Sequence, residues 1–299
     1  MKLSALADTG GDLIWAKCGA CVRVLRAPGL AILLPRQSSS LSKLPSRSEG
    51  YLHLSSETVT LGGDAMDGVG FGCTTMSVGN FGRSSGLVGL GRWPLSLVSQ
   101  LDVGAFSYFL IPYTDPTAKP SPLLFGSLAT LTGAGVQSTP LLPSVTTFYS
   151  VNLQSISFGS ATTACFGMVF DSGTTLTYLA EPAYTAAKDA VLQQAAALPR
   201  AANRHGFEAC FQASAGGGGS GSFPAMVLHF DGGADMALPT ANYMLEVGAR
   251  RDGVSCWGVQ RSPAAGTSII GNIMQMNFHI RYDVDRSMLS FLPANCSIV

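Results

Sequence analysis

The chain has 299 residues, enough for about two typical domains or for one fold with two lobes. Only 12% of the residues are charged, and 18 basic residues balance 18 acidic ones, which argues against a nucleic-acid or anionic-membrane partner. The apolar stretches fall far short of the roughly 18 residues that cross a bilayer. The 35 glycines and 16 prolines between short apolar runs predict a mostly β protein with tight turns and few helices.

The first chemical motif stands near the start of the chain, where an apolar stretch ends in Asp8-Thr9-Gly10. A glycine after the acid lets the chain turn sharply and brings backbone N–H groups toward the carboxylate. Alone, such an aspartate is most often a turn or cap residue. The residues before it are too few and too short in apolar length for a secretory signal, so either a signal lies upstream or the product stays in the cytosol.

Cysteines and histidines offer little chemistry of their own. Seven cysteines is an odd number, so at least one thiol remains in a fully oxidised chain. Cys18 and Cys21 have the spacing of half a zinc or redox site, but no second pair completes it, and no metal is predicted. The histidines show no ligand spacing and are expected at surface or strand positions: His53, His205, His229 and His279.

The middle of the chain contains a chance match to a serine-hydrolase motif and the expected boundary between two lobes. Residues 82–86 match the G-x-S-x-G pattern of serine hydrolases, but that pattern needs a helix after it, and residues 87–90 read as a strand. A short helix is expected at residues 94–101. The boundary between two lobes is expected near residues 140–144, which divides the chain into residues 1–143 and 144–299.

The second half opens with an apolar strand that ends in Asp171-Ser172-Gly173-Thr174. Residues 181–197 follow with helical spacing of apolar side chains and a proline in the first turn. Residues 216–222 (GGGGSGS) predict a flexible surface loop rather than a phosphate cradle. Residues 278–282 alternate apolar and polar side chains, which is typical of a strand with one buried face. Residues 295–297 form a glycosylation sequon, which is meaningful only if the protein is secreted.

The two halves repeat each other. Each has an apolar strand ending in Asp-(Thr/Ser)-Gly, and each has an apolar-apolar-Gly element further on, at residues 87–89 and 269–271. Such a repeat predicts a duplicated architecture. If a pseudo-twofold axis relates the halves, Asp8 and Asp171 become neighbours and share one proton. One then serves as general base to a water, and the other polarises the scissile carbonyl.

These motifs resemble the pepsin family of aspartic proteinases, in particular its plant nepenthesin-like branch. The similarity covers most of the chain and is carried by an ordered series of segments: GLVGLGRWPLSLVSQL (86–101), FSYF (106–109), LLFGSLA (123–129), FYSVNLQSISFG (148–159), VFDSGTTLTYL (169–179), FPAMVLHFDGGADMALPTANY (223–243) and SIIGNIMQMNFHIRYD (268–283).

The resemblance implies a mostly β, bilobal fold of two pseudo-twofold-related lobes with a cleft between them and a few short helices. It implies an aspartic-type endopeptidase without metal or organic cofactor, with Asp8 and Asp171 as the catalytic pair. The supporting residues are those next to the pair: Thr9, Gly10, Ser172, Gly173 and Thr174. It also implies a disulfide between Cys210 and Cys256.

The chain departs from the family pattern at four places in the first half. Seven residues precede Asp8, where relatives have a further strand pair. The cysteine-rich insert and the flap that covers the cleft are expected to be missing between residues 47 and 50, and Tyr51 is no substitute for the flap tyrosine. Gly11 stands where relatives have a serine that hydrogen-bonds the catalytic carboxyl. Ser46 and Phe109 replace two cysteines that relatives keep. Cys18 and Cys21 are expected to have lost partners in the insert, and Cys296 is expected to be unpaired too.

Three hypotheses remain open from the sequence. The first is an endopeptidase, expected to be a monomer, active at acid pH on an extended polypeptide in the cleft, and extracellular or vacuolar by family resemblance. The second is a catalytically impaired peptide-binding or inhibitor-like protein, because closure of a flap over substrate excludes water and orders the site. The third is a truncated product that does not fold stably.

Overall fold

The computed structural model describes most of the chain. Its described residues are 3–18, 42–43, 52–74, 84–115, 120–144, 146–165, 167–212, 223–248, 253–263 and 266–297. The predicted glycine-rich loop, the expected loss of the flap between residues 47 and 50, Tyr51 and Cys21 lie outside the described residues. The described part is mostly β with a few short helices, as the composition predicts.

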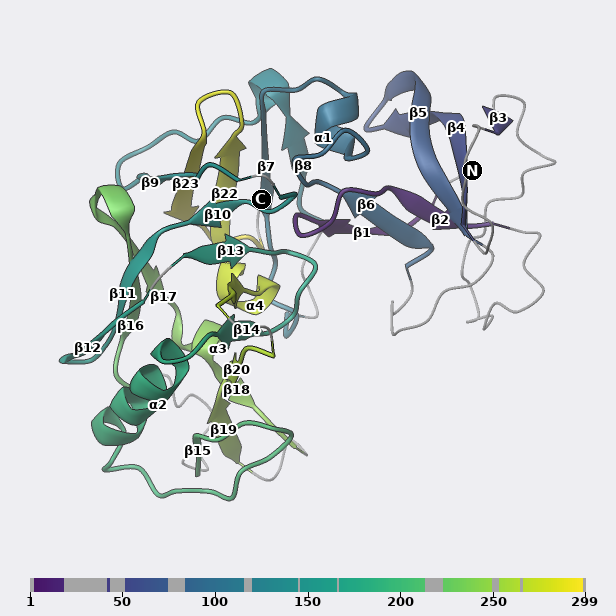
Figure 1. The fold of residues 1–299 in the computed structure, drawn as a ribbon. Coiled ribbons are helices and arrows are strands. Elements are labelled where there is room, and N and C mark those ends of the chain that lie inside the picture. Colours follow the sequence, from purple (N-terminus) through teal and green to yellow (C-terminus); the bar gives the residue numbers. More distant parts are fainter. Residues whose placement is uncertain are drawn as a thin grey trace. The chain divides into compact units, whose positions relative to one another are not determined.

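Contacts divide the chain into two compact units. Unit 1 consists of Met1–Val103 with Val145–Phe148, and unit 2 consists of Gly104–Ser144 with Tyr149–Val299. Their strands and helices are labelled in Figure 1. Each unit has its own sheets, and each holds one of the two aspartate motifs.

Unit 1 is built on one six-stranded sheet with the order β1-β6-β2-β5-β4-β3. Its strands are β1 (Ala5–Asp8), β2 (Trp15–Lys17), β3 (Ser42–Lys43), β4 (Leu52–Leu61), β5 (Asp64–Thr74) and β6 (Gly86–Gly89). Strands β4 and β5 form a long antiparallel hairpin. Its two-residue turn consists of Gly62 and Gly63, and Gly62 has a φ of 66°, which only glycine adopts without strain.

The described residues of unit 2 form four sheets. The first sheet has, in order, β10 (Ser150–Val151), β13 (Met168–Phe170), β21 (Ser268–Ile270), β14 (Thr177–Leu179) and β20 (Val259–Arg261), and the second has β12 (Ala161–Ala164), β11 (Leu153–Phe158), β16 (Met226–Phe230) and β17 (Ala234–Leu238). The third sheet has β15 (Cys210–Gln212), β19 (Val254–Trp257) and β18 (Met244–Glu246). The fourth sheet has β8 (Leu123–Phe125), β7 (Ala105–Phe109), β22 (Phe278–Asp283), β23 (Met288–Pro293) and β9 (Gln137–Pro140).

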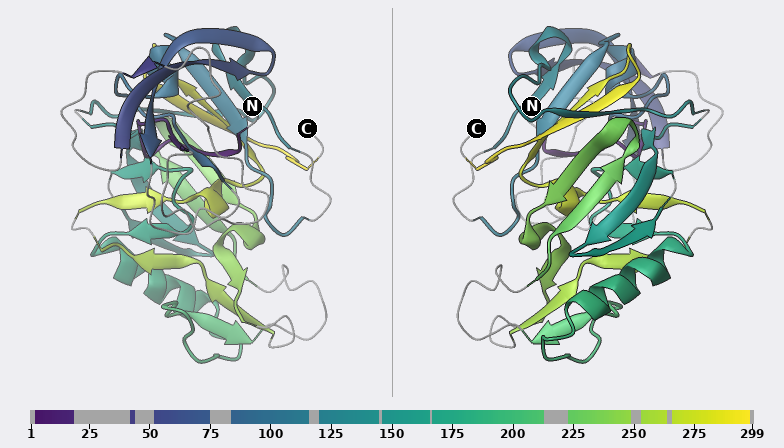
Figure 2. Two further views of the ribbon diagram at one scale, coloured as in Figure 1. Left: turned by 90° about the vertical axis from the view of Figure 1, so that its right-hand side faces the viewer. Right: turned by 90° about the vertical axis from the view of Figure 1, so that its left-hand side faces the viewer.

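The helices are short, as predicted. The predicted helix at residues 181–197 is confirmed as α2 (Ala183–Gln194), which packs against β11 and β12 (Figure 2). The helix expected at residues 94–101 is limited to α1 (Leu97–Gln100), because Ser96 caps it through its side chain. The other short helices are α3 (Thr240–Tyr243), α4 (Asn272–Gln275), and the 3-10 turns η2 (Gly126–Leu128) and η4 (Asp231–Gly233).

Residues 104–144 belong to unit 2 because of strand pairing. Strand β7 pairs with β22, and β9 pairs with β23, so a segment from the first half supplies β7, β8 and β9 to a sheet whose other two strands come from the end of the chain. The predicted lobe boundary between residues 143 and 144 stays a prediction. The compact units follow these strand pairs instead.

The side chains on the two faces of β22 are more equally buried than the alternation in the sequence predicts. The expectation of one buried face is wrong for His279, which is 8% exposed. It is covered because β22 lies between β7 and β23, and the Phe109 ring stacks on the imidazole with ring centroids 3.9 Å apart. Burial lowers the pKa of His279 from its ordinary value, so the neutral form is favoured in the folded state.

Candidate functional site

Both aspartate motifs sit on the same three-strand arrangement, once in each unit. In unit 1, β6 lies between β1 and β2, parallel to β1 and antiparallel to β2. In unit 2, β21 lies between β13 and β14 with the same two directions. The aspartate stands where the first strand ends, and the apolar-apolar-Gly element forms the middle strand. The repeat seen in the sequence is therefore a repeat of local topology.

Gly89 and Gly271 occupy matching places where the middle strand passes the loop that follows the aspartate. A Cβ on Gly89 would lie 2.1 Å from the backbone oxygen of Asp12, and one on Gly271 would lie 2.3 Å from the backbone oxygen of Leu176. Neither contact is possible for a larger residue without moving the loop. The glycine in each element, which has no side chain, thus leaves room for the aspartate loop to lie close to the sheet.

We expect Gly271→Ala to lower the free energy of unfolding of unit 2 by about 3 kcal/mol, since the added methyl meets rigid backbone. The measurement is chemical denaturation followed by intrinsic fluorescence. Gly167→Ala is the matched control, because a Cβ there would come no closer than 3.8 Å to another atom. Equal stability of the two variants would contradict the tight approach at Gly271.

Asp171 accepts hydrogen bonds on both carboxylate oxygens. The backbone N–H groups of Gly173 and Thr174 donate to Oδ1 at 2.8 and 3.1 Å. The Thr174 hydroxyl donates to Oδ2 at 2.6 Å. The loop is tied to α4 by the Asn272 side-chain amide, which donates to the Ser172 backbone oxygen at 3.1 Å. Asp171 is 9% exposed, so these hydrogen bonds hold a nearly buried carboxylate in a fixed position.

Asp8 has a related but different environment. The Gly10 N–H donates to Asp8 Oδ1 at 2.8 Å, as Gly173 does to Asp171. Thr9, between them, is fully buried. Gly11 takes the place of Thr174 and brings no hydroxyl, and a Cβ there would lie 2.8 Å from Asp8 Oδ2. The serine-to-glycine departure noted in the sequence therefore falls directly beside the carboxylate.

Asp12 is a residue of this site that the sequence motifs did not single out. Its Oδ1 accepts hydrogen bonds from the Thr147 hydroxyl at 2.5 Å and from the Trp93 N–H at 2.9 Å. It thereby ties the aspartate loop of unit 1 to the segment after β6, where the side chains of Trp93 and Leu95 are exposed. The sequence feature that could have identified Asp12 was its position directly after Gly11.

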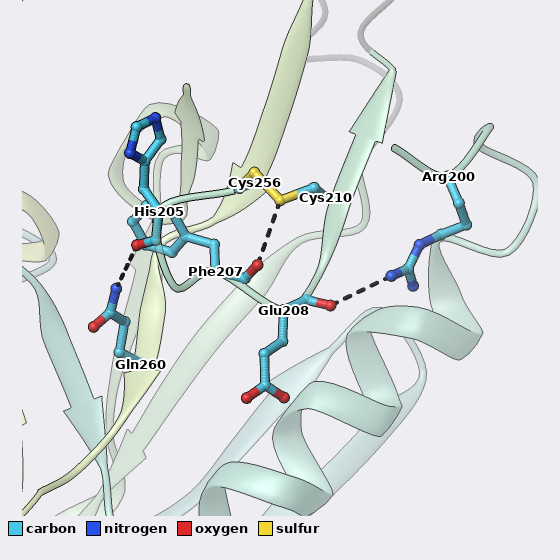
Figure 3. Close-up of a disulfide and its surroundings, with 7 residues drawn as sticks. All are labelled: Arg200, His205, Phe207, Glu208, Cys210, Cys256 and Gln260. Atoms are coloured by element: carbon cyan, nitrogen blue, oxygen red, sulfur yellow. Dashed lines mark hydrogen bonds between the residues drawn. A yellow bond between two sulfur atoms is a disulfide. The ribbon is translucent and has the colours of Figure 1, made fainter. Parts of the chain in front are cut away.

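The Cys210–Cys256 disulfide implied by the family resemblance is present in the structure. The two residues face each other on β15 and β19, and Figure 3 shows the bond beside Phe207. The Phe207 carbonyl oxygen lies 3.8 Å from the Cys210 sulfur. On either side, the Arg200 guanidinium donates to the Glu208 backbone oxygen and the Gln260 amide donates to the His205 backbone oxygen. The bond therefore lies within a segment held from both flanks.

The expectation that Cys18 lacks a partner is wrong. Cys18 forms a disulfide with Cys73, 55 residues away, because β2 and β5 are parallel neighbours and bring their ends together. Cys165 and Cys296 are free, as expected for Cys296, and both are buried. Burial raises the pKa of each thiol to about 11, so neither is a reactive thiolate near neutral pH.

The described residues add two further findings. No group of three or more His, Cys, Asp or Glu side chains among them is placed to hold a metal ion. None of the helices in that part of the chain is long and apolar enough to cross a membrane. Gly86, in the G-x-S-x-G decoy, begins strand β6 rather than a helix, which confirms that the serine-hydrolase elbow is not formed there.

Two family matches cover most of the chain. The Xylanase inhibitor N-terminal family matches residues 48–127, and the Xylanase inhibitor C-terminal family matches residues 148–293. Among solved structures, Basic 7S globulin from soybean superposes with a TM-score of 0.75 and 19% sequence identity, over 99% of this chain and 90% of that one. At that identity the similarity is evidence for the fold alone.

Curated relatives match at higher identity. Aspartic proteinase nepenthesin-1 from Nepenthes gracilis is 36% identical over 98% of this chain and 75% of its own length. Aspartic proteinase nepenthesin-2 from the same plant is 33% identical over 99% of this chain and 75% of its own. Aspartyl protease family protein 2 from Arabidopsis thaliana is 33% identical over 97% and 67%.

Proposed function

Because this chain belongs to the nepenthesin-like plant aspartic proteinases, with a pepsin-like fold, we propose that it is an aspartic-type endopeptidase whose catalytic pair is Asp8 and Asp171. The observation that carries the proposal is the repeated three-strand arrangement with an aspartate at the same point in each unit. The local hydrogen bonds support it, since each carboxylate accepts at least one backbone N–H from its own loop.

In this proposal a water held by the pair attacks the scissile carbonyl. One carboxylate takes the proton of the water, while the other, protonated, donates a hydrogen bond to the carbonyl oxygen. The product of attack is a gem-diol, which collapses with proton transfer to the leaving amine. No covalent intermediate and no cofactor take part, and Gly10, Gly173 and Thr174 hold each carboxylate in place within its own loop.

The substrate in this proposal is an extended polypeptide with apolar side chains beside the cut. Trp93 and Leu95 support that preference, because both side chains are exposed and the Trp93 backbone N–H is hydrogen-bonded to Asp12 in the aspartate loop of unit 1. The protein acts as a monomer, without nucleic-acid or membrane partners, in the extracellular space or the vacuole.

The test is cleavage of a denatured protein substrate from about pH 2 to pH 8. We expect an optimum below about pH 5 and inhibition by the transition-state mimic pepstatin, because the pair must share one proton to work. Cleavage with an optimum near neutral pH that pepstatin does not inhibit would overturn the proposal.

A second candidate, a peptide-binding protein with weak or absent turnover, is favoured by one observation. Gly11 brings no hydroxyl to Asp8, whereas Thr174 gives one to Asp171. The names of the matching families, which describe xylanase inhibitors, fit this alternative. Tight pepstatin binding without peptide cleavage at any pH would support it.

A pair of variants at Gly11 measures how much the missing hydroxyl matters. The methyl of Gly11→Ala would press on Asp8 Oδ2, so we expect the peptidase activity to fall about tenfold. Gly11→Ser adds the same carbon with a hydroxyl that can donate to that oxygen, so it should be clearly more active than Gly11→Ala. The measurement is kcat/KM on a fluorogenic peptide at acid pH. Equal activity of both variants would contradict a role for the hydroxyl.

A further inference from the structure

Three polar side chains on one sheet of unit 2 form a hydrogen-bonded chain that the aspartic proteinase site does not use. Ser157 lies on β11, His229 on β16 and Asp235 on β17. These strands run side by side, as Figure 1 shows, and His229 stands directly opposite Asp235 in the register. The three residues are up to 78 positions apart in sequence and are brought together only by the sheet.

The distances and atoms match a nucleophile, a base and an orienting acid. The Ser157 Oγ lies 2.8 Å from His229 Nε2, and His229 Nδ1 lies 2.7 Å from Asp235 Oδ1. Both ring nitrogens are therefore engaged, one by the hydroxyl and the other by the carboxylate. This is the connectivity that activates serine in hydrolases of unrelated folds.

The proton positions follow from the acceptor character of the carboxylate. An ionised Asp235 can only accept, so His229 Nδ1 must carry the proton that binds it. A neutral imidazole then has a lone pair at Nε2, which accepts the proton of the Ser157 hydroxyl. The arrangement thus fixes the tautomer in which His229 can act as a general base toward Ser157.

The chain of residues is open to small molecules. The side chains of His229 and Asp235 are 30% and 59% exposed, and Ser157 is half-buried. The opposite face of the same sheet is closed, because Ile156, Phe158 and Met226 line a common space with residues of α2. The polar face of this sheet therefore meets solvent while its apolar face meets the helix.

We propose that Ser157 is an activated nucleophile, with His229 as its general base and Asp235 as the positioning residue, and that it accepts acyl groups from small aryl esters. Ser157 Oγ bonds to the ester carbonyl carbon while its proton passes to His229 Nε2. The bond from that carbon to the aryl oxygen then breaks, and the leaving oxygen takes the proton back. Water then attacks the acyl carbon and gives a proton to His229 Nε2, the bond from that carbon to Ser157 Oγ breaks, and Oγ takes the proton back as the free acid leaves.

The strand geometry sets the reactivity of this site. Ser157 pairs with Thr162 on β12 and with Val227 on β16, so its backbone groups belong to the sheet ladder and not to an oxyanion hole. The developing negative charge consequently lacks backbone donors from Ser157. The site should react with esters that have good leaving groups, and should leave peptide bonds untouched.

In the test, the full chain is labelled at neutral pH with a fluorophosphonate, and the label is located by peptide mass spectrometry. We expect the label on Ser157, none at this position in Ser157→Ala, and a labelling rate at least about a hundredfold lower in His229→Gln. Ser155→Ala is the matched control, because Ser155 lies on the same strand, opposite His229, without the hydrogen bond to it. That control should label like the unaltered chain.

Asp235→Asn should slow labelling while thermal stability stays the same, and Asp235→Glu should keep more of the rate than Asp235→Asn. The proposal is overturned if Ser157 stays unlabelled, or if His229→Gln labels Ser157 at the original rate. The result is independent of the peptidase proposal, because Asp171→Asn should label normally at Ser157.

Discussion

Asp171→Asn is expected to lower peptide hydrolysis at acid pH at least about a thousandfold. Asparagine keeps the shape of the side chain, and its amide oxygen can still accept from the N–H groups of Gly173 and Thr174. It cannot take a proton from water, so the general base or its protonated partner is lost. The measurement is kcat/KM on a fluorogenic peptide, with pepstatin binding as a check that the variant still binds an inhibitor.

Asp189→Asn is the matched control for this variant. Asp189 is an exposed carboxylate on α2 of the same unit, so its replacement changes the charge of unit 2 by the same amount and leaves the loop alone. Asp8→Asn should lose activity to a similar degree, since the two carboxylates act as one unit. More than a tenth of the original activity in Asp171→Asn would exclude the proposed pair.

Replacing both Cys210 and Cys256 by alanine is expected to lower the free energy of unfolding of unit 2 by about 4 kcal/mol. The bond closes a loop with a sequence separation of 46, and opening such a loop restores chain entropy to the unfolded state. Strand β15 lies at the edge of its three-stranded sheet and keeps backbone hydrogen bonds to residues 199–201 on its other side, so the expected cost comes from chain entropy and not from loss of the strand. Thermal melting followed by circular dichroism should show a midpoint roughly 10 °C lower.

Cys165→Ala is the matched control, because Cys165 is a buried cysteine that forms no disulfide. It loses a sulfur atom from the interior without opening a loop, so its cost should be about 1 kcal/mol. Melting of the double variant within about 1 °C of this control would show that the disulfide does not stabilise unit 2.

The sequence was sufficient where the chemistry is local. Asp-(Thr/Ser)-Gly predicts a turn that presents backbone N–H groups to the carboxylate, and both loops have it. Helix α2 was predictable because its apolar spacing and its proline lie within one segment. The reason for Gly89 and Gly271 was not visible in the sequence, since the atoms that exclude a side chain belong to other loops.

The sequence was insufficient where distant segments meet. Cys18 was expected to be without a partner, yet the parallel pairing of β2 and β5 brings it to Cys73. His279 was expected on an exposed face, yet β22 is an inner strand and Phe109 covers the ring. Residues 104–144 fold with unit 2 for a similar reason, because sheet pairing depends on partners far along the chain.

The sequence by itself determined the family, the repeated motifs and the two candidate aspartates, because these depend on residue types at short and fixed spacings. The tertiary structure alone decided that Cys18 pairs with Cys73 and that His279 is buried. It also decided that Ser157, His229 and Asp235 form one hydrogen-bonded chain. The physical reason is that a β-sheet sets side chains opposite one another by strand order and register, and neither quantity is written in any single stretch of sequence.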